Sequence, residues 1–399
     1  MTDEDDTMHN ETMYQLGNAP SAIRELFAYG MQRKAEIGDE NVFDFSIGNP
    51  SVPAPESVAA AIRDLADMPP AELHAYSPAQ GLESTRQAIA DNLNERFGTS
   101  YSADNFYLTM GAAACLSACF TALIESGDEI VVIAPYFPEY RVWIQFAGGV
   151  CVEVPAREDN FQIDLDALEA ALTERTKAVV INTPNNPVGT VYTRETLEGL
   201  ARVLESAERA YGHDIYLISD EPYRELAYGV EVPWVPSIYD NTLVCYSWSK
   251  SLSLPGDRIG YVLVPDAVND ARKVYLAVCG AGRSLGYICA PVFFQRVIER
   301  CVGEPTNVGA YAINREILTN ALDDLGYEYI APDGAFYLWI KALEDDAQDF
   351  SNKAKQHELL LVPSDSFGVG GWVRAGYCID KETIERSIPA FAALKEDYA

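Results

Sequence analysis

Basic residues are scarce in this chain of 399 residues. Lysine and arginine together number 29 against 60 aspartates and glutamates, and the formal net charge is −31 at pH 7. No cluster of lysines and arginines occurs along the sequence. Because nucleic acid and anionic membranes would repel so acidic a chain, we expect neither as a partner. We interpret the acidity as a contribution to solubility.

Metal-ligand patterns are also missing. The only histidines are His9, His74, His213 and His357, and none lies near a pair of cysteines. The eight cysteines are dispersed and mostly sit in apolar runs, without the spacing of a zinc site. This distribution predicts buried free thiols in a reducing compartment and no bound metal.

Long hydrophobic runs and a recognisable export signal are absent as well. No uncharged apolar stretch reaches the about 18 residues that a membrane span needs. The N-terminus reads Met-Thr-Asp-Glu-Asp-Asp, whereas a signal peptide begins with positive charge followed by an apolar run. These features predict a cytoplasmic protein that is not inserted in a membrane.

The residues that are present indicate a folded α/β protein. Apolar residues make up 48% and aromatic residues 11% of a chain long enough for about two or three domains. From about residue 43, helical patterns alternate with short apolar runs. The runs that we interpret as strands are 106–110, 129–133, 178–182, 215–219 and 243–246. Continuous apolar runs of this length are typical of strands covered on both faces, as in a mostly parallel, doubly wound sheet.

The pattern changes after about residue 290, where helical stretches precede shorter strands near 335–340 and 371–377. We predict an N-terminal arm with part of a small domain over residues 1–48, a large domain over 49–288 and a small α+β domain over 289–399. No low-complexity linker separates the two domains, so we expect them to share a large interface.

Polar side chains follow four of the predicted strands. Open parallel sheets bind ligands at the carboxyl ends of their strands, so these side chains are expected to meet. They comprise a helix start of small residues, an amide, a carboxylate with a phenol, and a lysine with two hydroxyls and an arginine. In chain order these are residues 111–114, Asn186, Asp220, Tyr223, Lys250 with Ser247 and Ser249, and Arg258.

Pyridoxal 5′-phosphate is the ligand that best explains this set. Backbone N–H groups at a helix start can approach a phosphate, and hydroxyls with a guanidinium can complete the anion site. A lysine can form a Schiff base with an aldehyde. A carboxylate can keep a pyridine nitrogen protonated, which makes the ring an electron sink. Phe137, or its neighbour Tyr136, could stack on a flat ring, although a core position for Phe137 is almost as good an interpretation.

The run 246–261, Tyr-Ser-Trp-Ser-Lys-Ser-Leu-Ser-Leu-Pro-Gly-Asp-Arg-Ile-Gly-Tyr, resembles the lysine motif of class I/II aminotransferases of fold type I. Residues 185–189, 219–223 and 76–86 resemble further motifs of that family, in the same order. The matches span roughly residues 45–380. The resemblance implies an aspartate aminotransferase-like fold, a large domain with a mostly parallel doubly wound sheet plus a smaller α+β domain. It also implies a homodimer with shared active sites.

The resemblance also implies roles for single residues. Lys250 would bind the cofactor aldehyde and move a proton, Asp220 would pair with the pyridine nitrogen, and Tyr223 and Asn186 would hold the ring hydroxyl. The phosphate would be bound by Ala113, Ala114, Ser247, Ser249 and Arg258, and by Tyr76 of the partner subunit. Phe137 would cover the ring. Arg374 would bind the substrate α-carboxylate, with Asn186 and the backbone of Gly48 beside it.

The chain departs from the family pattern in two places. Residues 112–114 are all alanine where many relatives carry a polar side chain, and Val188 replaces a frequent threonine. Neither change removes the backbone donors. Asp220 could instead cap a helix, and Arg258, Arg374 and Tyr76 could be structural residues. We favour the functional interpretation for each.

The predicted reaction moves an amino group from an L-amino acid to a 2-oxo acid. Aspartate and 2-oxoglutarate are the leading substrates, since Arg283 lies where relatives contact a second carboxylate, and alanine, aromatic or broad-range donors follow closely. A carbon–sulfur β-lyase of the same fold is the alternative enzyme. A non-enzymatic regulator is disfavoured, because the first 40 residues are too short and too acidic for a DNA-binding domain.

Overall fold

A seven-stranded sheet lies at the centre of the large domain in the computed structural model, which describes residues 9–19 and 21–399. Its strand order is β2-β8-β7-β6-β5-β3-β4. The strands are β2 (Phe106–Thr109), β3 (Glu129–Ala134), β4 (Val150–Pro155), β5 (Thr176–Asn182), β6 (Tyr216–Asp220), β7 (Thr242–Ser247) and β8 (Gly260–Leu263). Only β8 runs antiparallel to its neighbours. The mostly parallel sheet predicted from the apolar runs is confirmed.

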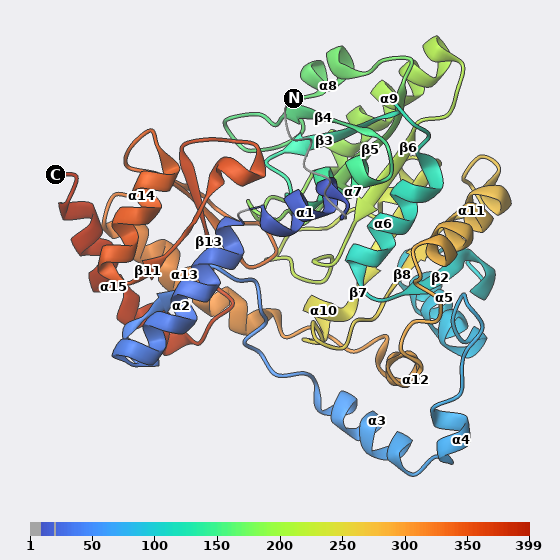
Figure 1. The fold of residues 1–399 in the computed structure, drawn as a ribbon, viewed down its shortest axis with the longest axis horizontal. Coiled ribbons are helices and arrows are strands. Elements are labelled where there is room, and N and C mark those ends of the chain that lie inside the picture. The colour runs from blue at the N-terminus through green and yellow to red at the C-terminus, as the bar shows by residue number, and fades with distance from the viewer. Residues whose placement is uncertain (1–8, 20) are drawn as a thin grey trace, which may run out of the picture.

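Helices cover both faces of this sheet (Figure 1). Within β3, Ile130 and Val132 face one apolar cluster whereas Val131 and Ile133 face the other, which explains why the strand is a continuous apolar run. The first cluster includes α6 (Ala112–Leu123), α7 (Glu139–Phe146) and α11 (Ala271–Ser284). The second includes α8 (Leu165–Ala171) and α9 (Arg194–Tyr211).

The strands at the β2 end are covered by a third helical group. It consists of α3 (Glu56–Ala66), α4 (Pro70–Leu73), α5 (Glu83–Phe97) and α12 (Val292–Cys301). Val297 and Ile298 of α12 pack in this cluster of the large domain. The predicted boundaries near residues 48 and 288 stay a prediction.

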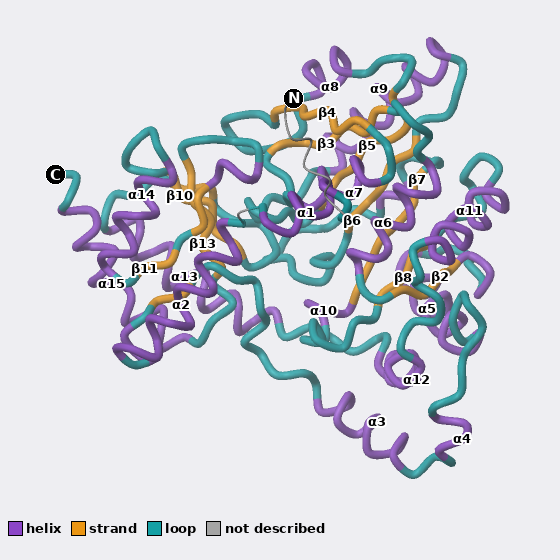
Figure 2. Tube along the Cα trace, in the orientation of Figure 1, coloured by secondary structure: helices purple, strands orange, loops and turns teal. Residues whose placement is uncertain are grey.

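The small domain contains the other strands, which form a separate group in Figure 2. Its antiparallel sheet has the order β12-β13-β10-β9, with β9 (Tyr329–Ile330), β10 (Tyr337–Lys341), β12 (Val362–Pro363) and β13 (Trp372–Gly376). A parallel pair joins β1 (Phe43–Asp44) to β11 (Leu359–Leu360). The helices are α2 (Ala22–Ile37), α13 (Val308–Asp324), α14 (Ala347–Ala354) and α15 (Lys381–Glu396). The N-terminal segment thus completes a domain built mainly from the C-terminal one.

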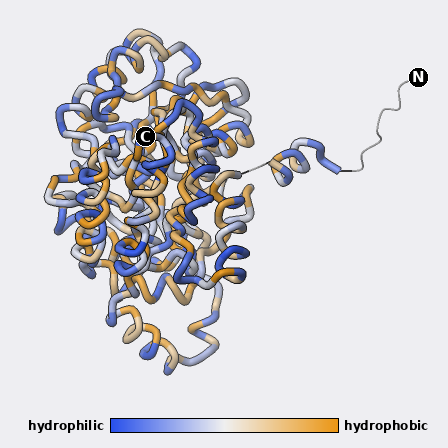
Figure 3. The backbone as a smooth tube through the Cα atoms, turned by 90° about the vertical axis from the view of Figure 1, so that its left-hand side faces the viewer, coloured by the Kyte–Doolittle hydropathy of each residue, from blue (hydrophilic) through white to orange (hydrophobic). Residues whose placement is uncertain are grey.

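Two segments extend away from the body of the molecule. Helix α1 (Glu11–Asn18) has no buried residue, and Figure 3 shows it standing clear of both domains. The α3–α4 segment forms the protrusion at the bottom of the same view. Of the helices that the structure describes, none has the length and apolar character needed to cross a membrane.

The remaining helices are short. They are α10 (Trp248–Ser251) and the single-turn 3-10 helices Asp39–Asn41, Ala103–Asn105, Val235–Ser237, Lys355–His357 and Ser364–Phe367. Of these, α10 matters most for the site because it begins directly after β7 and carries Lys250.

Candidate active site

A cavity of about 290 Å³ lies at the carboxyl ends of β5, β6 and β7, where the two domains meet. Of the thirteen side chains and backbone positions predicted for the site, eleven line it. These are Gly48, Ala113, Phe137, Asn186, Asp220, Tyr223, Ser247, Ser249, Lys250, Arg258 and Arg374. Ala114 and Tyr76 do not. The carboxyl-end rule for parallel sheets therefore located the cavity correctly.

Lys250 is buried in this cavity. Its Nζ donates a hydrogen bond to the carbonyl oxygen of Gly48 at 2.5 Å. The pKa of Lys250 is lowered to about 8, mainly by burial and also by the cations Arg374 and Arg258, whereas the Cys378 thiol opposes the change. Because only the neutral amine attacks a carbonyl, this lysine is far closer to its reactive form than a solvated one.

Asp220 is the last residue of β6 and lines the same cavity. The hydroxyl of Tyr140 donates to Oδ2 at 2.5 Å, whereas Oδ1 is buried without a hydrogen-bond partner. Burial raises the pKa of Asp220 to about 7; the bond from Tyr140 lowers it, and the charge of Glu221 raises it. A buried acceptor without a donor is costly, so the fold leaves this oxygen ready for a donor from a ligand. A protonated ring nitrogen would fit it.

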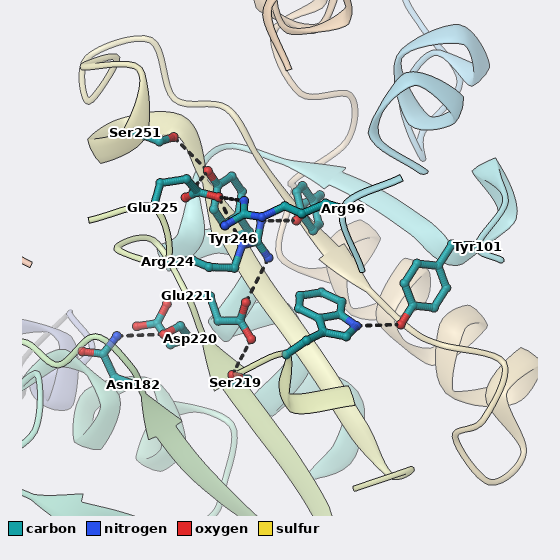
Figure 4. A network of polar contacts seen from close by, with 12 residues as sticks. Arg96, Tyr101, Asn182, Ser219, Asp220, Glu221, Arg224, Glu225, Tyr246 and Ser251 are labelled. Atoms are coloured by element: carbon teal, nitrogen blue, oxygen red, sulfur yellow. Dashed lines mark hydrogen bonds and ion pairs between the residues drawn. The ribbon is translucent and has the colours of Figure 1, made fainter. Parts of the chain in front are cut away.

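A buried charge network lies beside Asp220 at the end of β6 and Tyr246 near the end of β7 (Figure 4). Glu221 accepts hydrogen bonds from Ser219 at 2.7 Å and from Arg224 at 2.9 Å. The Arg224 guanidinium lies 4.3 Å from the ring centroid of Tyr246, one residue before Ser247. The charges thus pair behind the cavity and leave the free oxygen of Asp220 as its anionic group.

Small residues at the start of α6 lie beside a guanidinium and two hydroxyls. Gly111 has φ +89°, and a Cβ there would lie 2.9 Å from a guanidinium nitrogen of Arg258. Ser247 donates to Ser249 at 3.1 Å beside it. The Ala114 N–H donates to the Gly111 carbonyl oxygen and is therefore not free for a ligand. Small side chains at this helix start leave room for a phosphate against the backbone.

Arg374 lies at the opposite side of the cavity, on β13. Its guanidinium donates to Asn186 Oδ1 at 3.0 Å and to the Ser46 carbonyl oxygen at 2.6 Å. Its Nε is buried without a partner. The cation is thereby held in one plane and keeps hydrogen-bonding capacity for an anion, as bidentate recognition of a carboxylate requires.

The model of the family "Aminotransferase class I and II" matches residues 40–391. The chain belongs to the class I/II aminotransferases. It is therefore an enzyme that transfers amino groups with pyridoxal 5′-phosphate, and its fold is aspartate aminotransferase-like, as the motifs implied.

Curated relatives and solved structures agree with this family. The chain is 31% identical over 382 residues to the aspartate/prephenate aminotransferase of Thermus thermophilus. The matched region covers 94% of this chain and 96% of that protein. Among solved structures, an amino transferase of Eubacterium rectale has a TM-score of 0.96 at 54% identity, covering 98% and 99%. The aspartate aminotransferase of Thermus thermophilus with maleate has a TM-score of 0.84 at 28% identity, covering 94% and 97%.

The residues of this aminotransferase fit the cofactor. The unpartnered Oδ1 of Asp220 suits a protonated pyridine nitrogen, and the small-residue start of α6 with Arg258 suits a phosphate. Phe137 lines the cavity. The hydroxyl of Tyr136 instead donates to Glu153 at 2.8 Å and accepts from Arg141, so Tyr136 is held outside.

Two predicted residues lie apart from the cavity. Tyr76 is 95% exposed, on the loop that follows α4. Arg283 is exposed near the end of α11 and does not line the cavity of its own chain. Either residue would need a second copy of the chain to act at an active site.

The structure also brings in residues that we did not predict. Tyr140 bonds Asp220, and Tyr337, Trp143 and Ile23 line the cavity. Tyr140 could have been considered, because it lies in the first turn of the helix that directly follows Phe137. Tyr337 has no such signal in the sequence, since it lies on a strand of the other domain.

Proposed function

We propose that this cavity is the active site and that Lys250 is its reactive amine. The observation that carries the proposal is the pairing, in one cavity, of a buried lysine with a buried aspartate oxygen that lacks a donor. Pyridoxal phosphate, when bound, supplies an electron sink that stabilises negative charge at the substrate α-carbon. Lys250 Nζ removes the proton from that carbon, and Asp220 keeps the ring nitrogen protonated.

The other residues position the two reactants. Arg258, Ser247, Ser249 and Ala113 hold the phosphate, whereas the predicted role of Ala114 is not part of this proposal, because its N–H already donates to the Gly111 carbonyl oxygen. Asn186 and Tyr223 hold the ring hydroxyl, and Phe137 covers the ring. Arg374 binds the substrate α-carboxylate beside Asn186 and Gly48. Support for this last role is the buried, unpartnered Nε of Arg374.

We propose aspartate as the preferred donor and 2-oxoglutarate as the acceptor. Several relatives at about 30% identity are named aspartate aminotransferases. Arg283 of a second copy is our candidate for the distal carboxylate. The apolar side chains of Ile23, Leu116 and Trp143 in the cavity also suit larger donors, so a broad range is the second candidate.

The test of this function is the absorbance spectrum of the purified protein with added pyridoxal phosphate. We expect a visible band that aspartate bleaches, with recovery on addition of 2-oxoglutarate, because each half-reaction changes the bound cofactor reversibly. The donors that bleach the band rank the substrates, and an Arg283→Ala variant should lose bleaching by aspartate more than by alanine. A band that persists while pyruvate and ammonia accumulate would identify a β-lyase instead.

We propose further that the enzyme is a homodimer in which Tyr76 reaches the phosphate of the partner subunit. Its support is the 95% exposure of Tyr76 and the exposed apolar side chains Met13, Tyr14 and Leu16 of α1. We expect light scattering to give twice the mass of one chain. Tyr76→Phe is expected to weaken pyridoxal phosphate binding about tenfold, through loss of a hydrogen bond to a charged group. The exposed Tyr29→Phe is the control, and unchanged binding in Tyr76→Phe would refute the shared site.

A further inference from the structure

Two tyrosines meet across the domain interface inside the cavity. Tyr223 follows β6 of the large domain, and Tyr337 begins β10 of the small domain. Their hydroxyl oxygens are 3.0 Å apart, and both side chains are buried. Among the described residues, the Tyr337 hydroxyl has no other hydrogen-bond partner. The pair is therefore a single hydrogen bond between the part of the site that holds the cofactor ring and the part that carries Arg374.

Counting protons sets the direction of this bond. Each phenol carries one proton and can accept in return. If Tyr223 donates to the ring hydroxyl of the cofactor, its proton is used, and the bond between the two phenols can form only with Tyr337 as donor. A hydroxyl that accepts a hydrogen bond becomes a stronger donor itself, because the two bonds polarise each other in a buried site.

The aromatic ring of Tyr337 has a second contact. The guanidinium carbon of Arg374 lies 4.5 Å from its ring centroid, the geometry of a cation–π interaction. The hydroxyl end also occupies the space over Gly48, where a Cβ would lie 1.9 Å from it. Gly48 in turn accepts the bond from Lys250. The polar groups that face this phenol are thus Tyr223, Arg374 and the thiol of Cys378, with Lys250 beyond Gly48.

We propose that Tyr337 is a positioning residue. Its hydroxyl donates a hydrogen bond to the hydroxyl of Tyr223, so that the Tyr223 proton is directed to the ring hydroxyl of the cofactor. Its ring meanwhile supports the face of Arg374. The inference rests on the proposed function of the cavity and extends it, because one side chain of the small domain then acts on both the cofactor and the substrate carboxylate.

The two contacts can be separated by substitution. Tyr337→Phe removes the hydroxyl and keeps the ring. The pH midpoint at which the visible band of the Lys250–cofactor linkage titrates should then rise by about half to one unit. The midpoint should rise for the following reason. Tyr223 stabilises negative charge on the ring oxygen of the cofactor, and this charge is greatest when the Lys250–cofactor linkage is deprotonated. A weaker donor at Tyr223 therefore disfavours the deprotonated form. KM for the amino acid should change less than twofold. Tyr337→Leu also removes the ring, and there KM should rise about tenfold.

A double variant tests whether Tyr337 acts through Tyr223. Tyr223→Phe is expected to raise the midpoint by more than Tyr337→Phe does, and Tyr223→Phe with Tyr337→Phe should titrate like Tyr223→Phe alone. The matched control is Tyr377→Phe, which removes another buried bond between two phenols of this region, from Tyr377 to Tyr228 at 3.1 Å, outside the cavity. It should leave the midpoint unchanged.

The outcomes are distinguishable. A Tyr337→Phe midpoint equal to that of the native protein, or additive shifts in the double variant, would overturn the role of Tyr337 and leave the proposed function intact. A native protein that shows no visible band with pyridoxal phosphate would overturn both. Equal shifts in Tyr337→Phe and Tyr377→Phe would indicate general loosening of the small domain and would also overturn the inference.

Discussion

Lys250→Ala is expected to lower turnover by about 10⁴-fold, the largest loss that we anticipate for one substitution. The variant lacks both the amine that binds the cofactor and the base that moves the α-proton. No other lysine lines the cavity that the structure describes. The measurement is the rate at which the 2-oxo acid forms from aspartate in the presence of 2-oxoglutarate and pyridoxal phosphate, followed over hours for the variant.

Folding must be separated from chemistry in this experiment. Lys250 makes one hydrogen bond, to the backbone of Gly48, so its loss should leave the melting temperature of the unliganded protein nearly unchanged. Lys273→Ala, an exposed lysine on α11, is the matched control and should keep native turnover. Turnover in Lys250→Ala above a hundredth of the native rate would show that another group does the proton transfer.

Asp220→Asn is expected to lower turnover by about 10³-fold while the shape of the site is retained. The amide oxygen still accepts from Tyr140, but the negative charge that keeps the ring nitrogen protonated is gone. The electron sink is weakened for every donor, so kcat should fall alike for aspartate and alanine. The exposed Asp240→Asn is the control.

The same substitution should change stability in the opposite direction. The folded carboxyl of Asp220 has a pKa of about 7, raised from the ordinary value of 3.8 by burial. Between these two pH values the unfolded chain binds fewer protons than the folded one, so the unliganded native protein loses stability as the pH rises from about 4 to about 7. Asp220→Asn removes this loss. Above pH 7 the unliganded variant should therefore melt at a higher temperature than the native protein, and a lower one would contradict the burial argument.

Local patterns predicted five of the seven strands of the central sheet. The apolar runs at 106–110, 129–133, 178–182, 215–219 and 243–246 each overlap a strand of the central sheet. The strands β4 and β8 were missed. Three of the six residues of β4 are exposed at the sheet edge, among them a glutamate and a proline, and β8 is only four residues long and begins with glycine. Such strands are specified by pairing with a neighbour more than by their own pattern.

The sequence by itself determined the family, the cofactor and the residues at the strand ends, among them Asn186, Asp220 and Lys250. The family follows from the resemblance of its motifs, and the strand-end residues were predictable because the carboxyl ends of neighbouring parallel strands must meet at one edge of the sheet. Only the tertiary structure decided that Asp220 keeps one oxygen free, that Tyr136 turns away while Phe137 faces the cavity, and that Tyr337 joins Tyr223. Those contacts depend on how α7 and the small domain dock against the sheet, and docking is set by packing between segments far apart in the chain.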